Sequence, residues 1–109
     1  MSKPTDLVQG TLDLLILRSL ALEPMHGWAV AQRIGQVSGD VLHVGQGALY
    51  PALHKLEQQG WITAEWDVSD NNRRAKYYTL TRAGQKALDA EAAQWERLAA
   101  AITLIVRTV

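Results

Sequence analysis

The sequence predicts a mostly helical α+β fold, in which three short helices and a β-hairpin precede one long helix. Three observations support this class. Apolar residues recur at helical spacing in the first half, alternate with polar residues over 62–68, and return to helical spacing toward the end. The 109 residues suffice for one domain. We place an N-terminal arm, a globular body and a final helix at 1–10, 11–81 and 82–109.

Two helices are predicted before residue 40. The first begins at Thr11 and carries leucines on most of its surface, which is typical of a helix that is buried on several sides. Pro24 ends this helix, because proline cannot continue a helical hydrogen-bond ladder. The second helix begins at Gly27 and ends at Gly39. We expect both helices to contribute to the core of the body.

A third helix is predicted from 46 to about 59, with Gly60 as its C-terminal stop. Leu49, Leu53 and Leu56 recur at i, i+4 and i+7, so they define its buried side. Pro51 is compatible with this helix, because the amides near a helix start lack partners within the helix. The opposite side is left facing solvent.

The period then changes to that of strands. The alternating stretch 62–68 predicts a half-buried strand, in which Trp66 shares a face with Ile62. Trp66 is therefore assigned, with Trp28 and Trp61, to packing in the core or at an interface. A polar turn cluster at 69–72 and a stretch rich in tyrosine and threonine at 74–80 predict a returning strand. The two strands form a β-hairpin with a basic tip.

The last helix is predicted by its cap and its seven-residue repeat. Thr81 is a suitable N-cap, and no proline follows it. Leu88, Trp95 and Ile102 recur every seven residues, which is typical of a seam between helices. This helix is about 37 Å long, too long to lie wholly against so small a body. Its apolar stripe therefore predicts a second copy of the chain as its partner.

This order of elements is that of a winged helix-turn-helix, in which the third helix lies in a major groove of DNA and the hairpin, or wing, contacts the adjacent backbone. The exposed side of the third helix offers an amide for an adenine edge, a methyl group for thymine, and further groups for phosphates. The wing offers cations for phosphates. The residues we assign to DNA contact are Gln46, Ala48, Tyr50, Pro51, His54 and Lys55 in the helix and Arg73, Arg74 and Lys76 in the wing.

Charge is balanced over the whole chain but not locally. Eleven Lys and Arg residues balance eleven Asp and Glu residues, so net charge gives no support for nucleic-acid binding. Five basic residues and no acidic residue lie between Asn71 and Leu88, and no acidic residue lies between Val41 and Leu56. A binding face can therefore be basic while the chain is neutral.

Several stretches of the chain, taken together, match a known family pattern. They are GTLDLLIL at 10–17, PMHGW at 24–28, GALYPALHKLE at 47–57, GWI at 60–62 and RRAKYYTLT at 73–81, with Gly84 close behind. The sequence resembles the PadR family of transcriptional regulators, in the short form that lacks a separate C-terminal domain. The resemblance runs from about Gly10 to Ile105.

The resemblance implies a homodimeric winged-helix DNA-binding protein, usually a repressor, which in some members is released from DNA by a small molecule. It implies that Tyr50 contacts the DNA backbone and that Arg73 and Arg74 lie on the wing. The chain departs from the pattern at Ala48, where members often have Thr or Ser, and one cap or phosphate contact is lost with the hydroxyl. The first and last helices would form the dimer, with candidate contacts at Leu12, Leu15, Leu88, Ala92, Trp95, Leu98, Ile102 and Ile105.

Trp95 has two interpretations. It falls where the resemblance implies an aromatic side chain beside an apolar cavity between subunits, which in short members holds planar aromatic effectors. It also fits plain packing between two copies, which aromatic side chains do well, and packing is the simpler interpretation.

Other classes of function find no support. The chain has no cysteine, no nucleophile–base motif and no glycine-rich phosphate loop, so we expect neither an enzyme nor a cofactor. His54 and Glu57 lack a third ligand nearby, so we expect no metal site. The longest uncharged apolar stretch, 98–106, is far short of the roughly 18 residues that span a bilayer, and the first residues do not form a signal peptide. We therefore expect a cytoplasmic protein with no membrane partner.

Two rival functions remain open at this stage. A winged-helix module that binds a protein instead of DNA would have the same fold. A ligand sensor without DNA activity would keep a cavity at Trp95 and lose salt-dependent binding to DNA. The basic wing and the side of the third helix that lacks acidic residues favour DNA, with a roughly palindromic operator that matches the two-fold symmetry of a dimer.

Overall fold

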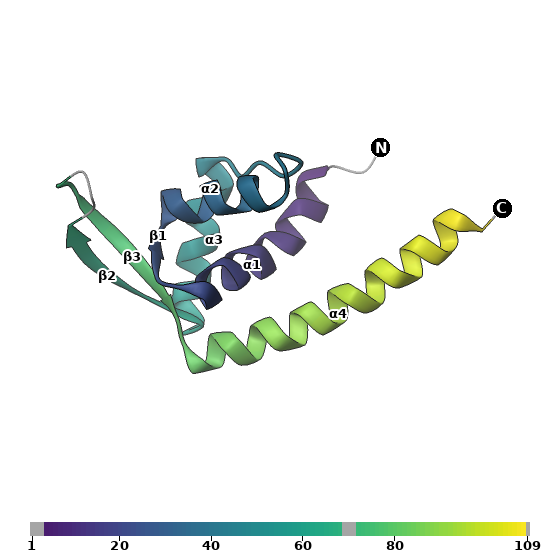
Figure 1. Cartoon of the computed structure of the whole chain (residues 1–109). Helices are drawn as coiled ribbons and strands as arrows, with labels where there is room; N and C mark the ends of the chain where they lie inside the picture. The colour runs from purple at the N-terminus through teal and green to yellow at the C-terminus, as the bar shows by residue number, and fades with distance from the viewer. Residues whose placement is uncertain (1–3, 69–71, 109) are drawn as a thin grey trace.

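The computed structural model describes residues 4–68 and 72–108 and has the predicted mostly helical α+β fold (Figure 1). Three short helices and a small antiparallel sheet form a winged-helix body, and one long helix leaves it (Figure 1). The elements are α1 (Pro4–Leu22), β1 (Met25–His26), α2 (Gly27–Val37), α3 (Gln46–Gln58), β2 (Ile62–Val68), β3 (Arg74–Leu80) and α4 (Arg82–Arg107).

The first helix begins earlier than expected. It starts at Pro4 and not at Thr11, so 4–10 are helical where an arm was predicted, and 1–3 lie outside the described residues. Proline is well suited to a first helical turn, because its fixed φ is helical and its missing N–H would have no partner there. The dense apolar pattern begins only at Thr11, so it did not reveal the helical residues 4–10.

The sheet has the strand order β1–β3–β2, with both pairs antiparallel. Ile62 pairs with Leu80 at the base of the wing, and Val68 pairs with Arg74 toward its tip. The two-residue strand β1 was not predicted, because it is too short to show a period and exists through its pairing with Tyr77 and Tyr78. This strand fixes the start of α2 against the base of the wing.

The core lies where α1 packs against α2, α3 and α4, beside the base of the wing. The predicted buried side of α3 is confirmed, because Leu49, Leu53 and Leu56 are buried together with Ala52. The remaining core side chains are Leu12, Ile16, Leu17, Leu20, Met25, Val30, Ile34, Ile62, Tyr78 and Leu88. Since α3 is fixed on its buried side, its other side is held rigidly toward solvent.

Short polar contacts fix the element boundaries. The His26 Nδ1 atom accepts a hydrogen bond from the Ala29 amide at 3.1 Å and caps α2. Thr81 caps α4, as predicted, since its Oγ1 atom accepts from the Gly84 amide at 3.0 Å and donates to the Gly60 carbonyl oxygen at 2.8 Å. Gly60 has φ of +79°, which favours glycine after a helix. These contacts join the end of α3 to the start of α4.

Helix α4 leaves the body and gives the molecule extents of 56 × 27 × 22 Å (Figure 1). At its start there is no room for a side chain, because a Cβ atom at Gly84 would overlap the carbonyl oxygen of Trp61. Farther along, its C-terminal end stands clear of the body, on the side opposite the wing (Figure 1). None of the helices in the described ranges is long and apolar enough to cross a membrane.

Candidate nucleic-acid interface

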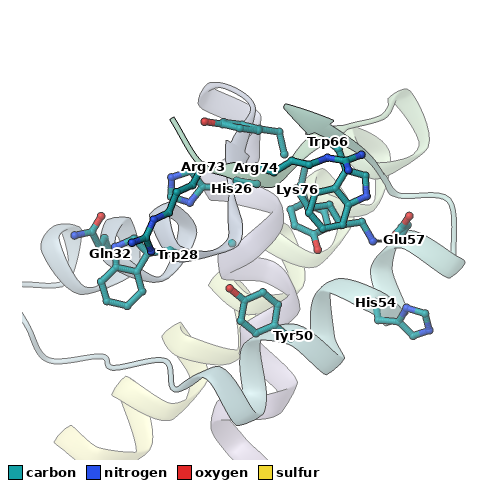
Figure 2. Close-up of a pocket in the computed structure, with 14 residues that line it drawn as sticks. His26, Trp28, Gln32, Tyr50, His54, Glu57, Trp66, Arg73, Arg74 and Lys76 are labelled. Atoms are coloured by element: carbon teal, nitrogen blue, oxygen red, sulfur yellow. Dashed lines mark hydrogen bonds and ion pairs between the residues drawn. The ribbon is translucent and has the colours of Figure 1, made fainter. Parts of the chain in front are cut away.

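A groove of about 990 Å³ lies between α2, α3 and the wing (Figure 2). It brings together residues from distant parts of the chain, from His26 to Tyr78. The side chains and backbone that line it belong to His26, Gly27, Trp28, Gln32, Tyr50, His54, Glu57, Trp66, Arg73, Arg74, Ala75, Lys76, Tyr77 and Tyr78. Five of the nine predicted DNA contacts therefore share one surface, namely Tyr50, His54, Arg73, Arg74 and Lys76.

The predicted exposed side of α3 divides into two parts. Tyr50 and His54 are exposed and face the groove, and Gln46 is exposed at the start of the helix. Ala48 is only half-buried and packs against the core, so its methyl group is less available to a base than expected. Pro51 is exposed within the helix, and the helix continues through it.

Tyr50 sits against the start of α2. A Cβ atom placed on Gly27 would lie 3.0 Å from the Tyr50 Cε1 atom and 3.3 Å from its hydroxyl oxygen. Glycine at this position therefore lets the start of α2 approach Tyr50 of α3 closely. The approach holds the Tyr50 hydroxyl beside the N-terminus of α2, where the helix dipole favours negative charge.

Lys55 lies on a different side of α3 from the groove. Its Nζ atom is 2.5 Å from the Oδ2 atom of Asp13, on α1, and the Asp13 side chain is only 17% exposed. Glu91 of α4 also acts on this site, because its pKa is raised by burial and by Asp13 and is lowered by Lys55. The ammonium of Lys55 thus links α3 to α1. The sequence did not reveal this contact, which competes with the predicted role of Lys55 at DNA.

One wing cation is also opposed by an acid. The Lys76 Nζ atom lies 3.4 Å from the Glu57 Oε1 atom, so the groove contains a carboxylate that was not expected beside the predicted DNA contacts. Lys76 Nζ also lies 5.8 Å from the centre of the Tyr78 ring. Burial, followed by Glu57 and Tyr50, raises the pKa of Tyr78 above its ordinary value of 10.0.

Of the three tryptophans assigned to packing in the core or at an interface, two are not in the chain's core. Trp28 and Trp66 are 55% and 58% exposed, and both line the groove (Figure 2). Trp66 does share a strand face with buried Ile62, but every residue of β2 from Glu65 onward is exposed. Arg74 places its guanidinium carbon 5.2 Å from the centre of the Trp66 ring. Trp61, by contrast, packs against the core as predicted.

The predicted dimer contacts also separate into two groups. Leu12 and Leu88 are 0% and 4% exposed, so they belong to the chain's own core and present no surface to a second copy. Leu15 and Ala92 are half-buried. The exposed members are Trp95, Leu98, Ile102 and Ile105, at 40%, 48%, 47% and 73%.

The fold and the groove define a winged-helix protein whose third helix and wing face one surface. Solved structures share this fold over nearly the whole chain. A transcriptional regulator from Clostridium thermocellum superposes with a TM-score of 0.85 at 24% identity, covering 94% of this chain and 99% of that one. A PadR family transcriptional regulator from Eggerthella lenta superposes with a TM-score of 0.79 at 30% identity, covering 96% of this chain and 89% of that one.

Sequence comparison identifies the family. The model of the transcriptional regulator PadR-like family matches residues 16–90. Transcriptional regulator Rv3488 of Mycobacterium tuberculosis is 35% identical over 91 residues, which cover 84% of this chain and 81% of that protein. The chain therefore belongs to the PadR-like family, and the resemblance inferred from its motifs is confirmed. Members of this family are transcriptional regulators and not enzymes.

Proposed function

We propose that this chain is a homodimeric repressor that binds a roughly palindromic DNA operator and acts in the cytoplasm. The observation that carries the proposal is the convergence of α3 and the wing on one groove. Tyr50 and His54 from the helix and Arg73 and Arg74 from the wing line that single surface (Figure 2). A duplex whose major groove received α3 would bring its backbone against the wing.

The roles of these residues follow from their positions. Gln46, exposed at the start of α3, reads a base edge. Tyr50 donates its hydroxyl to a phosphate beside the N-terminus of α2. Arg73 and Arg74 bind phosphates without regard to sequence. Lys55 and Lys76, which are already paired with carboxylates, contribute less than their charge alone would indicate.

A second copy of the chain covers the bare stripe of α4 in this proposal. Trp95, Leu98 and Ile102 recur on one side of a helix that stands clear of the body. Burying that stripe in a symmetric pair stabilises both chains and sets the distance between the two α3 helices. A planar aromatic effector that entered between the α4 helices beside Trp95 would change that distance and lower the affinity for DNA.

The first test is an in vitro selection of genomic fragments from the source organism, at two salt concentrations. We expect a two-fold symmetric motif whose binding weakens as salt rises. Retention that is sensitive to salt but blind to sequence would contradict a specific operator. No retention at all would favour a protein-interaction module, and binding of planar aromatics without any DNA binding would favour a ligand sensor.

The wing assignment is tested with Arg73→Ala combined with Arg74→Ala. Each lost phosphate contact lowers the salt slope by about one, so the double variant is expected to lower it by about two and to weaken binding similarly on all sequences. Gln46→Ala is the matched contrast. It is expected to relax the preference at particular bases and to leave the slope unchanged. An unchanged slope in the double arginine variant would remove the wing from the phosphate contacts.

A further inference from the structure

The wing carries an aromatic side chain that the stability of the body does not explain. Ile62, at the base of β2, is buried, whereas Trp66 on the same face of the same strand is 58% exposed. The C-terminal end of α4, which the proposed dimer would cover, lies at the opposite end of the molecule (Figure 1). Trp66 therefore belongs to neither the core nor the proposed dimer surface.

The contact that Trp66 makes is with a cation of the wing. Arg74 pairs with Val68 across the hairpin, and Trp66 pairs with Lys76, so Arg74 reaches Trp66 along the diagonal of the strand pair. The guanidinium carbon lies 5.2 Å from the centre of the ring, within the range of a cation–π contact. A guanidinium has five N–H donors, so one that is held over a ring retains donors for a phosphate.

The neighbouring cation on the same strand is held in a different way. Lys76 also lies over an aromatic ring, that of Tyr78, but in addition it is paired with the carboxylate of Glu57, which offsets part of its charge. Arg74 is held by a neutral ring, which orders the guanidinium and leaves its full positive charge. Arg74 and Lys76 both line the groove, so the Arg74–Trp66 contact and the Lys76–Glu57 ion pair lie on one surface (Figure 2).

We propose that Trp66 is a positioning residue that holds the Arg74 guanidinium toward the DNA backbone. The proposal rests on the DNA-binding function proposed above and adds a specific role to a residue outside the recognition helix. Trp66 acts through Arg74 and does not contact DNA itself. The ordering of Arg74 before binding reduces the conformational entropy that binding must remove.

The test is a double-mutant cycle on a 30-base-pair duplex that carries the selected motif. Trp66→Ala is expected to weaken binding about two- to fivefold in the wild-type background, the range that a partly exposed cation–π contact provides. In the Arg74→Ala background the same substitution is expected to have no further effect. In the Arg73→Ala background, which removes the adjacent charge, its full effect is expected to remain.

A second pair of variants tests whether Trp66 acts through its aromatic ring or only through its size. Trp66→Phe keeps an aromatic face and is expected to retain most of the affinity, whereas Trp66→Leu keeps an apolar side chain and is expected to lose it. Thermal unfolding is measured for each variant to check that it folds. If Trp66→Ala does not fold, the comparison of Trp66→Phe with Trp66→Leu tests the proposal in its place. An equal loss with and without Arg74, or no loss at all, would overturn the proposal. A wild-type chain that fails to bind the duplex would instead overturn the DNA-binding function.

Discussion

The two halves of helix α4 have the same apolar period and opposite surroundings. In the first half, Gly84 and Leu88 are buried against the body, where α1 packs on α4. In the second half, Leu98 and Ile102 continue the stripe but are 48% and 47% exposed. A seven-residue repeat therefore identifies an apolar face and does not identify what covers it. The apolar face of the first half is buried by the chain's own body, and we propose that the face of the second half is buried by a second copy of the chain.

The largest expected effect is on the dissociation constant of the dimer, when charges are placed in the second half of α4. Leu98→Glu combined with Ile102→Glu would put four unpaired carboxylates into a two-fold interface, where burying a charge without a partner is strongly unfavourable. We expect the dissociation constant of the dimer to rise at least about 1,000-fold, or about 4 kcal/mol. Sedimentation would then show a single chain of 12.0 kDa, whereas the unchanged protein would sediment as a pair.

The control for this prediction lies on the other side of the same helix. Ala93 and Ala100 are exposed and lie on the side of α4 opposite the stripe. Ala93→Glu combined with Ala100→Glu adds the same charge and is expected to leave the pair intact. Dissociation by the control, or an intact pair in the Leu98 and Ile102 variant, would show that this stripe is not the dimer interface.

The first half is tested by removing a side chain from the core. Leu88→Ala is expected to lower the free energy of unfolding by about 2–5 kcal/mol, because it removes buried methyl groups and leaves a cavity beneath α4. Leu104→Ala, on an exposed side of the same helix, is expected to change it by less than about 0.5 kcal/mol. Urea unfolding should be measured in the dissociated Leu98 and Ile102 background, since association raises the apparent stability. Equal losses for Leu88 and Leu104 would show that α4 is not anchored by the core.

The same contrast explains which parts of the structure the sequence could predict. The bounds of α2, α3 and the wing follow from local signals, such as the cap at Thr81 and the glycine after α3, and these bounds agree closely with the structure. The strand β1 and residues 4–10 of α1 have weak local signals and were missed. Local patterns determine whether a segment is helical, while pairing with distant residues determines the rest.

The candidate interface shows the same limit. Periodicity placed Tyr50 and His54 on the exposed side of α3, and the structure has them there. It could not show that Lys55 meets Asp13, 42 residues away, or that Lys76 meets Glu57. It also assigned Trp66 to packing, because alternation along a strand does not show where the strand leaves the body. Spacing along one element therefore predicts a face, and contacts between elements decide its chemistry.

The smallest expected effect is on the free energy of unfolding and comes from Glu91, at the end of the buried half of α4. Glu91 is half-buried there, and its pKa is raised above 4.5 by burial and by the Asp13 carboxylate, with Lys55 acting in the opposite direction. A raised carboxyl pKa means that the folded chain binds more protons than the unfolded chain just above pH 4.5. The free energy of unfolding therefore falls as the pH rises from about 4.5 through the folded pKa, and the loss persists at neutral pH.

Glu91→Gln removes this titration and keeps the shape of the side chain. We expect the variant to be slightly more stable than the wild type at pH 7, by no more than about 0.5 kcal/mol because solvent screens the site, and equally stable near pH 4. The difference between their melting temperatures from pH 4 to pH 7 isolates Glu91, since the other carboxylates titrate in both proteins. Glu96→Gln, at an exposed carboxylate on the same helix, is the control and is expected to give no such difference. If the Glu91→Gln variant were instead less stable than the wild type at pH 7, the attraction between Glu91 and Lys55 would outweigh burial and the repulsion from Asp13. The charges of Asp13, Lys55 and Glu91, on α1, α3 and α4, would then stabilise the packing of the first half of α4 on the body.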